Sequence, residues 1–177
     1  DPGTEGLIGA PTPGEQNSVF ATNAAPQIRQ VRHTVDTPAA GQANIVTAKV
    51  TDPNGVASVA LHYQIVAPGN YIPATLPTPI AQMIAGNVPD SRTPNPAFED
   101  PANWTTVLMV DNGTNGDAIA GDNVYSATVP GQINRSLVRF RITVTDTLGA
   151  AVRVPYADDL SLNFAYYTYN GVPDYQG

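Results

Sequence analysis

One loop holds most of the groups in this chain that could do chemistry. Residues 111–125 read DNGTNGDAIAGDNVY and contain three carboxylates and three glycines just before a strand pattern. Set against the EF-hand calcium loop, D-x-[DN]-x-[DN]-G with an acid at position 12, the segment matches at Asp111, Asn115, Gly116 and Asp122. Calcium prefers hard oxygen ligands. The spacing therefore makes a cation site one of two interpretations of this loop.

The loop also departs from the EF-hand pattern. Position 3 is Gly113, which has no side-chain ligand, and position 12 is Asp122, which is shorter than the usual Glu. Asp111, Asn115, Asp117 and Asp122 would supply about four or five of the six to eight oxygens that Ca²⁺ takes, and water would complete the shell. The interpretation that we favour is a rigid surface turn without an ion, in which Asp and Asn side chains accept backbone N–H groups. A bound calcium ion is the alternative.

Catalytic patterns are poorly represented. The two histidines, His33 and His62, belong to no H-x-x-x-H or H-x-E motif, and no G-x-S-x-G elbow is present. The paired Asp158 and Asp159 are adjacent, so their side chains should point apart and terminate a strand. A hydrolytic enzyme is therefore the least favoured function.

Composition excludes several classes of partner. Only 13% of the residues are charged, the net charge is −7, and Lys49 is the single lysine among eight basic residues, so nucleic acid is not an expected partner. Cysteine is absent, which excludes disulfides and thiolate metal sites. No apolar run approaches the ~18 residues of a membrane span, so we expect no membrane insertion.

The pattern of apolar residues predicts an all-β fold. Along residues 137–145, Val138, Phe140, Ile142 and Val144 alternate with polar residues, as in a half-buried antiparallel strand. Similar alternation and turn signals predict an antiparallel β-sandwich of seven to eight strands. The expected strands span residues 27–33, 43–51, 58–66, 104–110, 124–129, 136–146, 150–156 and 163–170.

Proline and glycine mark the boundaries of this domain. Residues 1–25 are expected to be an N-terminal linker, residues 26–170 the sandwich and residues 171–177 a C-terminal linker of a longer protein. Within the sandwich, residues 68–102 contain eight prolines. We expect this insertion to be irregular and to cover an edge or end of a sheet.

Two further surfaces are candidates for binding. If strands 58–66, 136–146 and 150–156 are neighbours, five polar residues share one outward face: His62, Gln64, Arg139, Arg141 and Arg153. This face is either solvated or docks an acidic partner or a neighbouring domain. An aromatic set near the C-terminus comprises Tyr156, Phe164, Tyr166, Tyr167, Tyr169 and Tyr175. It suggests a sugar-stacking platform, although a last strand that seals the core or docks to the next domain is the favoured interpretation.

Three sequence blocks carry a family resemblance: VTAKVTDPNGVASVALHYQ (46–64), MVDNGTNGDAIAGDNVYSATVPG (109–131) and LVRFRITVTDTLGAAVRVPYADD (137–159). They resemble immunoglobulin-like or fibronectin-type-III-like modules. They are also similar to modules of large secreted bacterial proteins that carry lamin-tail-like domains and kinase-like domains of the spore-coat protein H type. The segment APTPGEQNS (10–18) is similar to the end of a lamin-tail-like domain.

The resemblance implies a non-catalytic module that is extracellular or on the bacterial cell surface. Such a module would act as a spacer, scaffold or interaction domain beside other domains of the same polypeptide. Another protein or a polysaccharide would be a further partner, and a carbohydrate-binding module is the alternative function.

Overall fold

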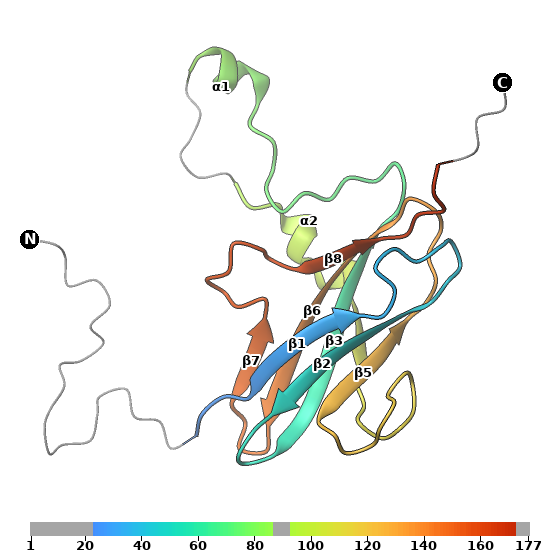
Figure 1. Ribbon diagram of the computed structural model, residues 1–177. Helices are drawn as coiled ribbons and strands as arrows, with labels where there is room; N and C mark the ends of the chain where they lie inside the picture. The colour runs from blue at the N-terminus through green and yellow to red at the C-terminus, as the bar shows by residue number, and fades with distance from the viewer. Residues whose placement is uncertain (1–22, 87–92, 173–177) are drawn as a thin grey trace, which may run out of the picture.

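The computed structural model describes residues 23–86 and 93–172, so most of both expected linkers lies outside the described residues (Figure 1). Within the described residues, eight strands form the body of the molecule. They are β1 (Gln27–His33), β2 (Asn44–Thr51), β3 (Val56–Val66), β4 (Thr105–Leu108), β5 (Val124–Val129), β6 (Leu137–Asp146), β7 (Ala151–Val154) and β8 (Phe164–Tyr167).

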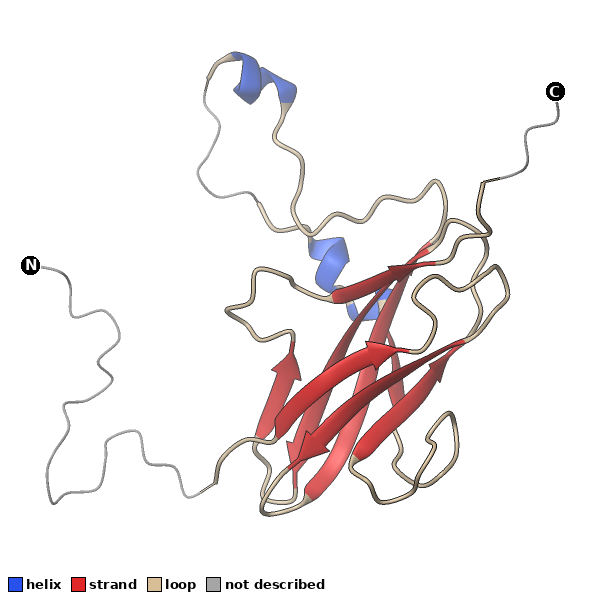
Figure 2. Cartoon of the chain, in the orientation of Figure 1, coloured by secondary structure: helices blue, strands red, loops and turns tan. Residues whose placement is uncertain are grey.

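The strands form two antiparallel sheets that pack as a sandwich, which confirms the predicted fold class (Figure 2). One sheet has the order β1-β2-β5, and the other has the order β4-β3-β6-β7, with β8 also paired to β6. Strands β7 and β8 share one edge of β6, because β7 pairs with residues 142–145 and β8 with residues 137–140. The predicted adjacency of β3, β6 and β7 is therefore correct.

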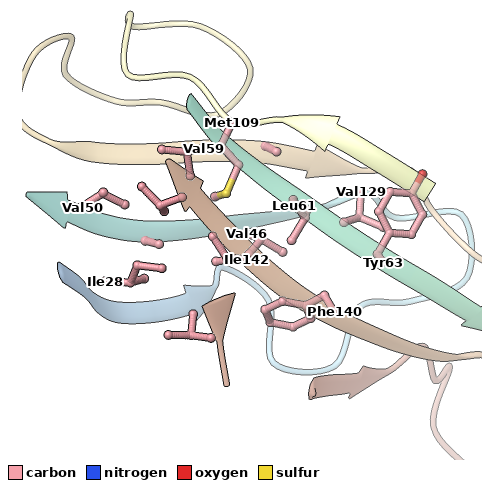
Figure 3. Packing of buried hydrophobic residues seen from close by; sticks show 14 of the residues in the cluster. Ile28, Val46, Val50, Val59, Leu61, Tyr63, Met109, Val129, Phe140 and Ile142 are labelled. Carbon is pink, nitrogen blue, oxygen red and sulfur yellow. The ribbon is translucent and has the colours of Figure 1, made fainter. Parts of the chain in front are cut away.

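The core lies between the two sheets and follows the predicted alternation (Figure 3). Leu61, Phe140, Ile142 and Val144 are all at most 1% exposed, and each buried apolar side chain contributes roughly 1.5–3 kcal/mol to folding. In β3 the inward alternation of Val59, Leu61 and Tyr63 ends before Ile65, which is 37% exposed.

The proline-rich insertion is more regular than expected. It contains α1 (Ile80–Ile84), α2 (Pro96–Glu99) and a 3₁₀ turn, η1 (Pro101–Asn103). Helix α1 projects from the body and buries none of its residues (Figure 1). Helix α2 instead packs on the outer face of the five-stranded sheet, where Phe98 is 3% exposed. The insertion thus covers a face of the sheet, whereas an edge or end was expected.

Local hydrogen bonds explain why α2 and η1 form in a proline-rich segment. The side chain of Asn95 accepts the backbone N–H of Ala97, and the side chain of Asp100 accepts that of Ala102. In both elements proline follows the cap, where its fixed φ fits the first turn and its missing N–H costs no hydrogen bond. Among the described residues, no helix is long and apolar enough to cross a membrane.

Candidate functional site

The acidic loop connects β4 to β5 and brings its carboxylates together. One side-chain oxygen each of Asp111, Asp117 and Asp122 lies within 4.8 Å of the others, and all three residues are half-buried. Three like charges this close repel one another, and a bound cation would remove that repulsion. Three of the four residues predicted as calcium ligands are therefore grouped in space.

Backbone N–H groups shape this cluster. Asp111 Oδ1 accepts from the N–H groups of Gly121 at 2.7 Å and Asp122 at 3.2 Å, and Asp111 Oδ2 accepts from Asn123 at 2.9 Å. Asp122 Oδ1 accepts the N–H of Val124 at 2.9 Å. These bonds fix both carboxylates in place. The predicted Asx-type turn is therefore present in the loop.

The remaining predicted ligands play different parts. Asp117 accepts the backbone N–H groups of Gly113 and Ile119 across the loop. Asn115 adopts a positive φ of 53°, and its backbone carbonyl accepts the hydroxyl of Thr128 at 3.2 Å. Asn115 thus helps to fasten the loop to β5 through its backbone. The cation site stays a prediction that rests on the three aspartates.

The second candidate is the outer face of the five-stranded sheet. In the pairing of β3 with β6, His62 lies opposite Arg141 and Gln64 lies opposite Arg139. Arg153 of β7 lies opposite Thr143 of β6. Because opposite residues of antiparallel strands have side chains on the same face, the register brings together the five polar residues predicted to share this face.

Part of this face is covered by the chain itself. Gln64 is only 1% exposed, and its side-chain amide donates to the carbonyl of Phe98 at 3.4 Å. Arg139 Nη1 donates to Gln64 Oε1 at 3.0 Å and to the carbonyl of Ile72 at 2.6 Å. The insertion therefore occupies the half of the face around Gln64 and Arg139.

Arg141 is the main anchor of that cover. Its Nη1 and Nη2 atoms each donate to one carboxylate oxygen of Glu99 at 2.8 Å, and its Nε donates to the carbonyl of Leu162 at 2.9 Å. The guanidinium stacks over the rings of Trp104, at 4.4 Å from the centroid, and Phe98, at 5.2 Å. Sequence reasoning missed Glu99, Phe98 and Trp104.

The other half of the face is an open pocket of about 270 Å³ between the insertion and β7. Its lining includes His62, Glu99, Trp104, Thr106, Arg141 and Arg153. The two ring nitrogens of His62 form hydrogen bonds with the hydroxyls of Thr106 at 2.9 Å and Thr143 at 2.7 Å. Burial lowers the pKa of His62, and the charges of Arg141 and Arg153 lower it further. His62 is therefore neutral at neutral pH.

The late aromatic residues divide between core and surface. Phe164 and Tyr166 pack against the core, and burial raises the pKa of Tyr166 to about 12. Tyr156, Tyr167 and Tyr169 are exposed, whereas Tyr175 lies outside the described residues. Strand β8 thus seals the core, as one part of the favoured interpretation of this run expected.

Comparison of the sequence with known proteins assigns this chain to no family. No protein-family model and no curated protein matches the chain.

Proposed function

We propose that this chain is a non-catalytic, extracellular β-sandwich module that acts as a spacer, scaffold or interaction domain in a larger secreted or surface protein of bacteria. The observation that carries the proposal is that the polypeptide enters the sandwich at one end and leaves it at the other (Figure 1). The sequence resemblance to immunoglobulin-like modules of such proteins supports the same function.

Contacts at the two ends define this path. Where the chain enters, the side chain of Asn23 contacts Asn54 in the β2–β3 turn and Asp146 at the end of β6, at 2.7 and 2.6 Å. Where it leaves, Asn170 Oδ1 accepts the N–H of Ala40 in the β1–β2 loop at 2.7 Å. The ten residues of β6 run between these ends and span about 33 Å at roughly 3.3 Å per residue. A module whose chain enters at one end and leaves at the other holds the preceding and following domains of the polypeptide apart. Several such modules can follow one another end to end.

A distance measurement tests this arrangement. The chain has no cysteine, so spin labels placed with Ala24→Cys and Val172→Cys report one distance by pulsed electron paramagnetic resonance. We expect a separation of about 30 Å or more. A control pair at one end, Ala24→Cys with Leu148→Cys, should give a clearly shorter distance. A 24–172 distance as short as the control would contradict the in-series arrangement.

We also propose that the acidic loop binds Ca²⁺ in this module. The convergence of three aspartate oxygens within 4.8 Å supports the proposal. Mg²⁺ is disfavoured because an oxygen-rich loop of this kind does not enforce octahedral geometry. Binding to the folded state alone would stabilise it by RT ln(1 + [L]/Kd), about 2.7 kcal/mol at a hundredfold excess of Ca²⁺ over Kd.

Calorimetry with one variant separates the ion from the turn. Asp122→Asn keeps an Oδ1 atom for the N–H of Val124 but removes the charge. We expect millimolar Ca²⁺ to raise the melting temperature of the parent protein, chelator to reverse the rise, and Asp122→Asn to abolish it. An unchanged melting temperature of the parent protein, or an equal rise in the variant, would contradict the calcium proposal.

A further inference from the structure

We propose that the pocket between η1 and β7 binds one carboxylate group of a small organic acid or sugar acid, with Arg153 as its main ligand. This pocket is the uncovered half of the outer sheet face.

The charges of the pocket leave one positive group in excess. Arg141 is neutralised by Glu99, because both oxygens of that carboxylate accept from its guanidinium at 2.8 Å. His62 carries no charge at neutral pH. Arg153 is exposed and forms no ion pair with any other described residue. Its charge lies close enough to lower the pKa of both His62 and Glu99. The pocket is thus locally positive in a chain whose net charge is −7.

A single excess charge favours a monoanion. A dianion such as sulfate would meet the carboxylate of Glu99, which is 61% exposed at the rim of the pocket. The planar guanidinium of Arg153 presents two parallel N–H groups that match the two oxygens of a carboxylate. A carboxylate therefore fits both the charge and the geometry of the free arginine.

His62 and its two threonine partners add a further hydrogen-bond donor to the pocket. A neutral imidazole has one N–H and one bare nitrogen. One hydroxyl of Thr106 and Thr143 must donate its proton to the bare nitrogen, while the other accepts from the ring. The accepting threonine keeps its own O–H proton, which is free to donate to a ligand. This holds for either tautomer of His62.

The volume and the lining of the pocket limit the ligand to about one ring. A volume of 270 Å³ lies just below the roughly 300–1,000 Å³ that is typical of ligand pockets. Trp104 supplies an apolar wall, which suits either an aromatic acid or the apolar face of a sugar. Benzoate and glucuronate both carry a carboxylate, but one has an aromatic ring and the other a sugar ring. Comparing their affinities therefore shows whether the pocket prefers an organic acid or a sugar acid.

The single tryptophan of the chain reports on the pocket directly. Its indole N–H, which donates to the carbonyl of Phe98 at 2.7 Å, gives one resolved signal in a nitrogen–proton correlation spectrum. We expect benzoate or glucuronate to shift this signal in a saturable manner, with a dissociation constant on the order of 1 mM. Neutral benzamide should leave it unchanged, and sulfate should bind at least about tenfold more weakly than the better carboxylate.

Variants assign the effect to Arg153. Arg153→Gln should weaken binding at least about tenfold, and Arg153→Lys should weaken it less because the charge remains and the planar fork is lost. Arg32→Gln, an exposed arginine on β1, makes the same change of net charge and should bind like the parent protein. The same spectra show whether each variant is folded.

Three kinds of result would overturn the proposal, and they can be told apart. No saturable shift with either carboxylate, or equal binding by Arg153→Gln, removes the site. Equal affinity for sulfate and carboxylates would mean a nonspecific anion site, and a response to benzamide would mean apolar binding at Trp104. Each outcome is independent of the distance measurement and of the calcium assay.

Discussion

Replacing Glu99 by Gln should lower the free energy of unfolding by about 1–2 kcal/mol. Both oxygens of Glu99 accept from Arg141, whose side chain is only 6% exposed, and hydrogen bonds to charged groups contribute roughly 1.5–3 kcal/mol. The value falls toward the lower end because the side chain of Glu99 is 61% exposed and partly screened by water. Glutamine keeps the size of the side chain and removes its charge.

Urea denaturation measures this loss with two probes. Fluorescence of Trp104, which stacks on Arg141, follows the insertion, and far-UV circular dichroism follows the strands. We expect the urea midpoint to fall by the same amount with both probes, because the module unfolds cooperatively. Asp158→Asn also removes one exposed carboxylate and should change stability by less than about 0.5 kcal/mol. A Glu99→Gln variant as stable as this control would refute the anchor.

The pH dependence gives a second test of the same contact. The hydrogen bond from Arg141 lowers the pKa of Glu99 below its ordinary value of 4.5, although burial opposes the shift and the charges of Arg141 and Arg153 assist it. A carboxyl with a lowered folded pKa stabilises the protein above its unfolded pKa and loses that effect as the pH falls. The stability difference between parent and Glu99→Gln should therefore shrink below about pH 4.5. A constant difference would contradict the ion pair.

Three further outcomes follow from burial and packing. Phe140→Ala should cost about 3–5 kcal/mol in urea denaturation, because the ring is 1% exposed in the core; a loss below about 1 kcal/mol would contradict the core assignment. Gly131→Ala should cost roughly 1–3 kcal/mol, because its Cβ would lie only 2.2 Å from the backbone carbonyl of Gly41; a thermal melt at the parent temperature would count against this packing. Limited chymotrypsin digestion, read by mass spectrometry, should cut after exposed Tyr71 before buried Phe98; early cleavage at Phe98 would contradict its burial under the insertion.

The strands and core were predictable because their signals are local. Alternation with period two marks the buried face of β6, and a turn sequence such as Asp52-Pro53-Asn54-Gly55 marks the end of a strand. Helix α2 and the turn η1 were not predicted, because proline usually ends a helix and is tolerated only in its first turn, where both elements carry it. Asn95 before Pro96 and Asp100 before Pro101 are local capping signals that would have indicated both elements.

The candidate sites were predictable only in part. The carboxylates of Asp111, Asp117 and Asp122 converge within one short loop, so spacing alone indicated their proximity. The same side-chain oxygens can accept backbone N–H groups in an Asx-type turn or coordinate a calcium ion. The sequence alone therefore does not decide between the turn and the ion site. The pairing of Glu99 with Arg141 joins residues 42 positions apart. Only the packing of the insertion on the sheet creates that contact.

Forced unfolding of a tandem array tests the central claim most directly, namely that the chain is one cooperatively folded module added in series. The array is pulled through its ends in a single-molecule force experiment. The roughly 150 residues of the sandwich, extended at ~3.5 Å each, should release about 500 Å per module in one step, after subtraction of the short folded length. Equal steps of this size, one per module, are the expected result. Two smaller steps per module, or extension without a force peak, would contradict the account.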